Sequence, residues 1–171
     1  MAYGAAVNSA DDSTDSKASR AISKPLPGVD FLRYYPGHRL IAWQPQGTLD
    51  DLMLNDIADW LVDIEKESLP FRYFKRFVDF TQLTIVAVRT DHVFEFARKR
   101  AQQLTGGEPV RTALFAANWV AFAVASMYES MVQDTLIKAR AFRDLADVAD
   151  WLAIPVDVLT LKDWPAPFES S

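Results

Sequence analysis

The sequence predicts an α/β domain: a mixed sheet of about five strands built from successive β-α turns, with an N-terminal antiparallel hairpin and four main helices. In the last third of the chain a β-prone run, a capping residue and a helix-periodic run follow one another, and the same order then repeats. This alternation is typical of parallel strands joined by crossover helices. Right-handed crossovers between neighbouring strands place successive helices on one side. We therefore expect the helices to cover mainly one face of the sheet.

The first part of the chain supplies the hairpin and the first helix. Residues 29–35 and 39–44 are β-prone and flank a Pro-Gly turn, which favours antiparallel pairing. Thr48 is the expected N-cap of the helix, with Asp51 three residues later in a variant of the capping box. Apolar residues then recur every three or four positions, as one helical face requires: Leu49, Leu52, Met53, Ile57, Trp60, Leu61 and Ile64.

The middle of the chain supplies a third strand and a second helix. Residues 73–80 alternate as a strand does, and one of its sides carries Phe74, Arg76, Val78 and Phe80. We interpret residues 81–89 as an extended linker. Thr90 is the expected N-cap of a helix over residues 91–104, and Gly106-Gly107 ends it. The apolar side of that helix is predicted to hold Val93, Phe94, Ala97, Ala101 and Leu104.

The last third completes the sheet. A strand over residues 109–117 precedes the N-cap Asn118 and a helix to about residue 131, and a strand over residues 136–142 precedes the cap Asp144 and a helix ending at Leu152. The helix after Asn118 is predicted to bury Val120, Ala123, Val124, Met127, Tyr128 and Met131. The last helix is predicted to bury Leu145, Val148, Trp151 and Leu152.

Both ends of the chain differ in composition from the middle. Residues 1–28 are rich in Ala, Ser, Asp and Thr and bury little surface, so we expect a flexible arm. Residues 29–154 form the expected single domain. Pro155 ends the last helix, and residues 155–171 form the expected tail, in which Leu161, Trp164 and Phe168 stand among prolines.

Composition excludes several classes of function. The chain has no cysteine, so disulfides, thiol nucleophiles and cysteine-based zinc sites are absent, and a cytoplasmic location is expected. No apolar run reaches the roughly 18 residues of a membrane span. The net charge of −5 argues against nucleic acid as a partner, although residues 72–111 hold 8 basic and 4 acidic residues.

No constellation of catalytic or metal-binding residues emerges from the sequence, and no cofactor is predicted. His38 lies in a turn, and His92 lies in a first helical turn. The aspartates of the first helix are best interpreted as a solvated outer face rather than paired catalytic carboxylates. Basic residues interleave with aromatics on two strands, namely Lys75, Arg76, Lys138 and Arg140. Such a pattern fits a nucleic-acid platform, or long side chains that cover the apolar surface of a half-exposed sheet.

Three short segments carry a family resemblance. The run Arg140-Ala141-Phe142-Arg143-Asp144 and the following helix to Trp151-Leu152 resemble the closing segment of STAS, or anti-sigma-factor-antagonist-like, domains, which are related to SEC14 and CRAL-TRIO domains. The segments Phe77-Val78-Asp79-Phe80-Thr81 and Gly47-Thr48-Leu49 are similar to two further parts of that family. The resemblance implies a STAS-like domain over residues 29–154.

The resemblance also implies a class of function. Its members act as phosphorylation-controlled binding partners, as domains of anion transporters, or as relatives of lipid carriers. Their phosphorylated Asp-Ser-Ser/Thr-Gly-type motif corresponds here to Ala87-Val88-Arg89-Thr90, in which Thr90 alone offers a hydroxyl as a phosphosite candidate.

We therefore expect a non-enzymatic module that binds protein partners or itself. Large apolar residues in excess of one packed face form its candidate interface, namely Trp119, Phe122, Trp164 and Phe168. The alternative is a carrier of an apolar small molecule or lipid. Its lining would include Phe94, Phe115, Met127 and Met131, which are equally consistent with an ordinary core.

Overall fold

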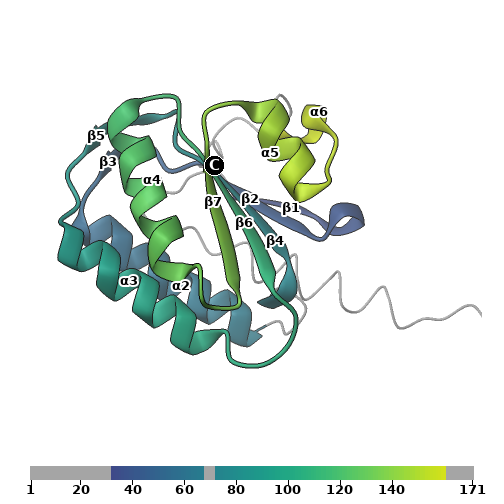
Figure 1. Cartoon of the computed structure of the whole chain (residues 1–171), viewed down its shortest axis with the longest axis horizontal. Coiled ribbons are helices and arrows are strands. Elements are labelled where there is room, and N and C mark those ends of the chain that lie inside the picture. The colour runs from purple at the N-terminus through teal and green to yellow at the C-terminus, as the bar shows by residue number, and fades with distance from the viewer. Residues whose placement is uncertain (1–31, 68–71, 161–171) are drawn as a thin grey trace, which may run out of the picture.

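The computed structural model describes residues 32–67 and 72–160 (Figure 1). Within these residues a five-stranded sheet has the order β1-β2-β4-β6-β7, and a separate two-stranded sheet joins β3 to β5. The strands are β1 (Leu32–Tyr35), β2 (Leu40–Trp43), β3 (Gly47–Leu49), β4 (Lys75–Asp79), β5 (Leu83–Val86), β6 (Val110–Phe115) and β7 (Ile137–Phe142). The helices are the 3-10 turn η1 (Pro36–His38), then α2 (Asp51–Glu67), α3 (Thr90–Gln103), α4 (Trp119–Val132), α5 (Leu145–Leu152) and α6 (Val156–Leu159).

The main sheet is mostly parallel. Strand β1 pairs antiparallel with β2 across η1, while β2 with β4, β4 with β6, and β6 with β7 are all parallel pairs. Each parallel pair needs a crossover, and α2, α3 and α4 lie in these crossovers. The carboxyl ends of β4, β6 and β7 therefore meet at one edge of the sheet.

Helices cover both faces of the sheet, but the three longest lie on the same face, so the prediction that they lie mainly on one face holds in part. Helices α2, α3 and α4 lie on one side, and α5 and α6 lie on the other (Figure 1). Strand β2 shows why: Ile41 and Trp43 pack in the core under α2, whereas Leu40 and Ala42 pack in the core under α5. The sequence of a strand buried on both faces is a continuous apolar run. Such a run does not indicate which face a later helix will cover.

The linker predicted over residues 81–89 contains a strand. Residues Leu83–Val86 form β5, which pairs in parallel with β3. The segment is β-prone, but its partner lies far away along the chain, so only the folded structure brings the two together. Thr48 belongs to β3 and is not a helix cap; instead Asp50 Oδ1 accepts a hydrogen bond from the Met53 backbone amide at 2.9 Å.

Of the three other predicted helix caps, two are confirmed and one is wrong. Asn118 accepts a hydrogen bond from Ala121 N, and Asp144 accepts one from Ala146 N, so both caps are confirmed. Thr90 is not an N-cap: it lies in the first turn of α3, and Arg89 takes the N-cap position, where no side-chain hydrogen bond caps the helix. Thr90 is thus one position too late to serve as the cap.

Several predicted core positions are exposed. Leu52, Phe94 and Val120 are exposed large apolar residues, and Ala123 is exposed too. Helix α4 buries Ala121, Ala125 and Val132 instead of the predicted stripe that begins at Val120. Because α4 is apolar nearly all round, its periodicity does not indicate which side faces the sheet.

The fold continues beyond Pro155. Residues that we assigned to the tail form α6, and Leu159 lies buried in the core under α5. The remaining predictions for the tail, including Trp164 and Phe168, and for the arm over residues 1–28 lie outside the described residues. Among the described helices, none combines the length and apolarity needed to cross a membrane.

Candidate functional site

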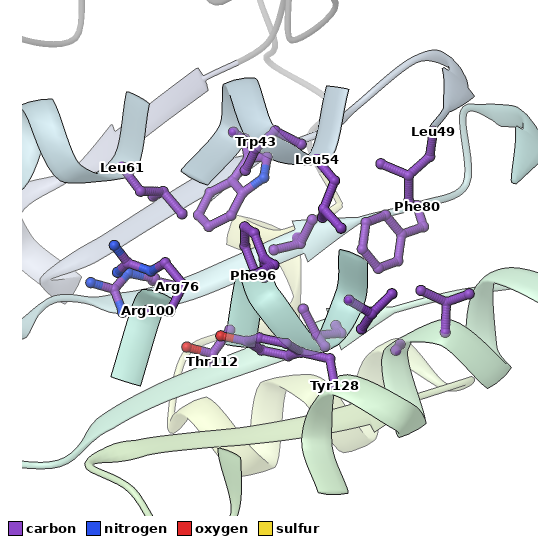
Figure 2. Close-up of a pocket in the computed structure, with 16 residues that line it drawn as sticks. Trp43, Leu49, Leu54, Leu61, Arg76, Phe80, Phe96, Arg100, Thr112 and Tyr128 are labelled. Atoms are coloured by element: carbon purple, nitrogen blue, oxygen red, sulfur yellow. The ribbon is translucent and has the colours of Figure 1, made fainter. Parts of the chain in front are cut away.

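A cavity of about 70 Å³ lies between the sheet and helices α2, α3 and α4 (Figure 2). Its lining residues come mainly from strands β2, β3, β4 and β6 and from the three helices. Most of its lining is apolar, with a few polar side chains: Trp43, Leu49, Leu54, Ile57, Leu61, Arg76, Val78, Phe80, Val93, Phe96, Arg100, Thr112, Leu114, Val124, Ala125 and Tyr128.

Two buried arginines share one carboxylate at the polar end of this cavity. Arg76 on β4 is 3% exposed, Arg100 on α3 is 1% exposed, and Glu65 on α2 is 7% exposed. Arg76 Nη2 donates to Glu65 Oε1. Arg100 Nη2 donates to Glu65 Oε1 at 2.6 Å, and Arg100 Nη1 donates to Glu65 Oε2 at 3.1 Å. We call these three residues the buried charge cluster.

The buried charge cluster carries a net positive charge. Burial, reinforced by the neighbouring Arg100 and opposed by Glu65, lowers the pKa of Arg76 to about 10. Arg76 therefore stays protonated at neutral pH, and the cluster holds two cations against one anion. A buried charge is costly unless it is paired. The cluster thus creates a positive potential at one end of the cavity.

Hydrogen-bonding groups beside the cluster remain free. Among the described residues, Arg76 Nε and Thr112 Oγ1 are buried without a hydrogen-bond partner. The side chains of Thr112 and Tyr128 bring their hydroxyls to the same end of the cavity as the two guanidinium groups (Figure 2). Burial raises the pKa of the Tyr128 phenol, while Arg100 and Arg76 oppose that rise. The phenol is therefore neutral and able to donate a hydrogen bond at neutral pH.

The opposite end of the cavity is apolar. Leu49, Leu54 and Phe80 lie there, away from the two arginines (Figure 2). Phe80, Phe96 and Val124 are only partly buried. The cavity therefore has a charged inner end and an apolar end with partly accessible walls.

Sequence reasoning missed the buried charge cluster, although a signal was present. Arg76 lies on the strand side predicted to carry Phe74 and Val78, and Arg100 follows Ala97 by three positions and precedes Leu104 by four. Both arginines thus occupy core positions of their elements. Basic residues near a helix C-terminus usually lie on the surface, so the sequence pattern alone favoured a surface position for Arg100.

The second candidate site is a surface at the carboxyl edge of the sheet. Trp119 is the first residue of α4, which follows β6, and it is 70% exposed. Its ring packs edge-on against the Phe122 ring, with the two ring centroids 6.0 Å apart. The Arg143 guanidinium, which follows β7, lies 3.6 Å from the Trp119 ring centroid and donates to the Ala117 carbonyl at 2.7 Å. We call Trp119, Val120, Phe122 and Arg143 the α4 edge surface.

Other predicted positions do not form a site. Thr90 is exposed in α3 beside a surface cluster in which Arg89 Nε lies 2.7 Å and His92 Nδ1 lies 3.2 Å from Asp51 Oδ2. A hydrogen bond from the Arg89 backbone amide is the main cause that lowers the pKa of Asp51. This cluster lies on the surface, outside the lining of the cavity. No group of three or more metal-ligating side chains occurs in the part of the chain that the structure describes.

The nucleic-acid platform also finds no support in the arrangement of the sheet. Helices lie against both faces, and Arg76 is buried. Arg111 and Arg140 lie 5.5 Å and 5.4 Å from the Trp151 ring centroid. These two side chains therefore cover apolar surface, as the second interpretation of the pattern requires.

Comparison with known proteins identifies a similar solved structure. No family model matches the chain, and no curated protein matches it. The crystal structure of an uncharacterized protein of the DUF3478 family from Shewanella loihica PV-4, described as having a SpoIIAA-like fold, is similar. The two chains share 14% identity with a TM-score of 0.46, over 73% of this chain and 94% of the other. SpoIIAA-like is the STAS-like type of fold.

Proposed function

We propose that the chain is a non-enzymatic STAS-like interaction module that binds a protein partner, or a second copy of itself, through the α4 edge surface. The observation that carries the proposal is Trp119, a large aromatic residue that is mostly exposed yet held in place by Arg143. The absence of cysteine fits a cytoplasmic location for such a module.

The composition of the α4 edge surface supports this proposal. Tryptophan and arginine dominate the residues that contribute most to binding at protein interfaces. The contact between Arg143 and Trp119 and the hydrogen bond to Ala117 restrict both side chains before a partner arrives. A restricted side chain loses less entropy on binding, so more of its contact energy appears as affinity.

The test compares Trp119→Ala with Leu52→Ala. Leu52 is equally exposed but lies on α2, which makes it a control for removing an exposed apolar side chain. Self-association of the full chain is measured by sedimentation equilibrium. Partner binding is measured by quantitative photo-crosslinking in cells of the source species. We expect Trp119→Ala to weaken the association by at least about 30-fold, the equivalent of 2 kcal/mol, and Leu52→Ala to leave it unchanged.

A double variant tests whether Arg143 acts through Trp119. If Arg143 mainly holds the indole in place, Arg143→Ala should weaken binding in the wild type and have little further effect in Trp119→Ala. Equal binding by Trp119→Ala and Leu52→Ala in both assays would refute the proposal. Catalytic turnover that a single substitution abolishes would refute its non-enzymatic part.

A second function, carriage of a small apolar molecule, is favoured by the cavity. A mostly apolar pocket with a few convergent polar groups is typical of ligand sites. Native mass spectrometry of protein purified from cells tests it, because the method reports a bound molecule and the oligomeric state together. We expect an added mass that denaturation removes. Protein that carries no such mass and takes up no apolar molecule would reject the carrier function.

A further inference from the structure

We propose that the cavity binds a small apolar monocarboxylate. Its carboxylate would lie against Arg76, Arg100 and the hydroxyls of Thr112 and Tyr128, and its hydrocarbon tail would extend towards Phe80. This inference rests on the proposed carrier function and names the chemical class of the cargo.

Charge balance favours a single anion. The buried charge cluster holds two guanidinium groups and one carboxylate, so one further negative charge would make it neutral. A neutral apolar ligand would leave the excess positive charge buried, and a dianion would overcompensate it. Planar guanidinium groups match the geometry of carboxylates particularly well.

Free hydrogen-bonding capacity lies beside the same position. Arg76 Nε and Thr112 Oγ1 are buried and lack partners among the described residues. Leaving such groups unpaired costs about 1–3 kcal/mol each. A carboxylate accepts several hydrogen bonds with its two oxygens, so a single ligand group at this end would satisfy both donors and the Tyr128 hydroxyl.

The size and polarity of the cavity define the rest of the ligand. Its volume of about 70 Å³ is roughly half that of a cavity of about 150 Å³ that admits benzene. The cavity therefore holds the carboxylate and only the first carbons of a hydrocarbon tail. A longer tail would leave between the partly buried Phe96 and Val124. Among the lining residues outside the polar end the side chains are apolar, which disfavours sugars and other polar tails.

A purely structural role explains the cluster less well. Replacing a buried ion-pair triad by apolar residues is often neutral or stabilising, so a net charged triad with unpaired donors contributes poorly to stability. Ionisable groups perturbed by burial in a cavity are typical of functional sites. The position of the cluster at the wall of the cavity links its charge to a ligand.

The experiment measures binding of hexanoate and hexan-1-ol to the full chain by isothermal titration calorimetry at pH 7. The two probes share a tail and differ in the charged head. We expect hexanoate to bind at least ten-fold more tightly. Thr112→Val and Tyr128→Phe remove one hydroxyl each with little change of shape. Each should weaken hexanoate several-fold and leave hexan-1-ol unchanged, whereas Thr84→Val on the exposed face of β5 should alter neither.

Glu65→Gln gives a change of opposite sign. Removing the negative charge leaves the two arginines without an anion, so the variant should bind hexanoate more tightly and gain more thermal stability from it than the wild type does. A cluster with only a structural role would be destabilised by this substitution without recovery by hexanoate. If Glu65→Gln does not fold, the two hydroxyl variants still decide the question.

The outcomes separate this inference from the carrier function. Equal affinities for hexanoate and hexan-1-ol would overturn the carboxylate preference and leave a carrier of neutral molecules. A preference for hexanoate that none of the cavity variants changes would place the anion elsewhere and overturn the site. No saturable binding of either probe would overturn both the inference and the carrier function.

Discussion

Two leucines to which the sequence assigns the same role differ completely in the folded chain. Both lie on a predicted apolar stripe of a helix, but Leu152 on α5 is 0% exposed and Leu52 on α2 is 70% exposed. We therefore predict that Leu152→Ala strongly destabilises the protein and that Leu52→Ala does not. The comparison tests whether α5 and α6 cover the second face of the sheet.

The magnitude for Leu152 follows from its surroundings. Burial of a leucine side chain contributes about 1.5–3 kcal/mol, and the space left by Leu→Ala adds about 24 cal/mol per Å³ of residual cavity. Leu152 packs in a cluster with Leu40 and Phe77, both fully buried on central strands. Those strands are held on both sides, so the space closes only partly. We expect a loss of about 3 kcal/mol, within the usual range for buried leucines.

The magnitude for Leu52 is much smaller. Only about a third of the residue is removed from water, so the transfer contribution is about 0.5 kcal/mol, and the higher helix propensity of alanine offsets part of it.

Equilibrium unfolding in urea measures both effects. With a slope of about 2 kcal/mol/M, Leu152→Ala should lower the midpoint by roughly 1.5 M and Leu52→Ala by less than about 0.3 M. The slope itself should not change. Similar midpoint shifts for the two variants would refute the assignment of buried and exposed faces.

Three further predictions concern single positions. Burial raises the pKa of Tyr128. The contribution of the buried phenol to stability is therefore complete below about pH 10 and is lost as the pH rises through the folded-state pKa. Tyr128→Phe should flatten the alkaline fall in the free energy of unfolding, and an unchanged fall would contradict this. Gly107 has φ +101°, and a Cβ added there would overlap the Tyr73 ring. Gly107→Ala should therefore cost more than about 1 kcal/mol, which a thermal melt that matches the wild type would exclude. Asn118→Ala should cost about 1 kcal/mol because it removes a cap, whereas Thr90→Ala should be nearly neutral in the same urea assay; equal losses would show that Thr90 has a structural role.

The order of elements could be predicted from the sequence because it depends on local signals. Asn118 and Asp144 cap the predicted helices, and their hydrogen bonds close within three residues. The sequence indicates structure only weakly where the element is short. Strand β5 is β-prone, but its pairing with β3 depends on residues far along the chain, so a strand and a linker look alike there.

The two candidate sites differ in how far the sequence indicates them. Trp119 and Phe122 were identified because α4 carries more large apolar residues than one packed face needs. The cavity could not be identified in this way. Arg76, Arg100 and Glu65 come from three separate elements, and each has an ordinary surface interpretation when it is considered alone.

The sequence by itself determined the α/β class, the succession of strands and helices and the caps of α4 and α5, because backbone propensity, periodicity and capping act over a few residues. Only the tertiary structure decided that helices cover both faces of the sheet, that Leu52 is exposed and Leu152 buried, and that two arginines meet one carboxylate beside a cavity. These features depend on which surfaces exclude water when distant segments pack, and that burial sets both the stability of the core and the charge of the cavity.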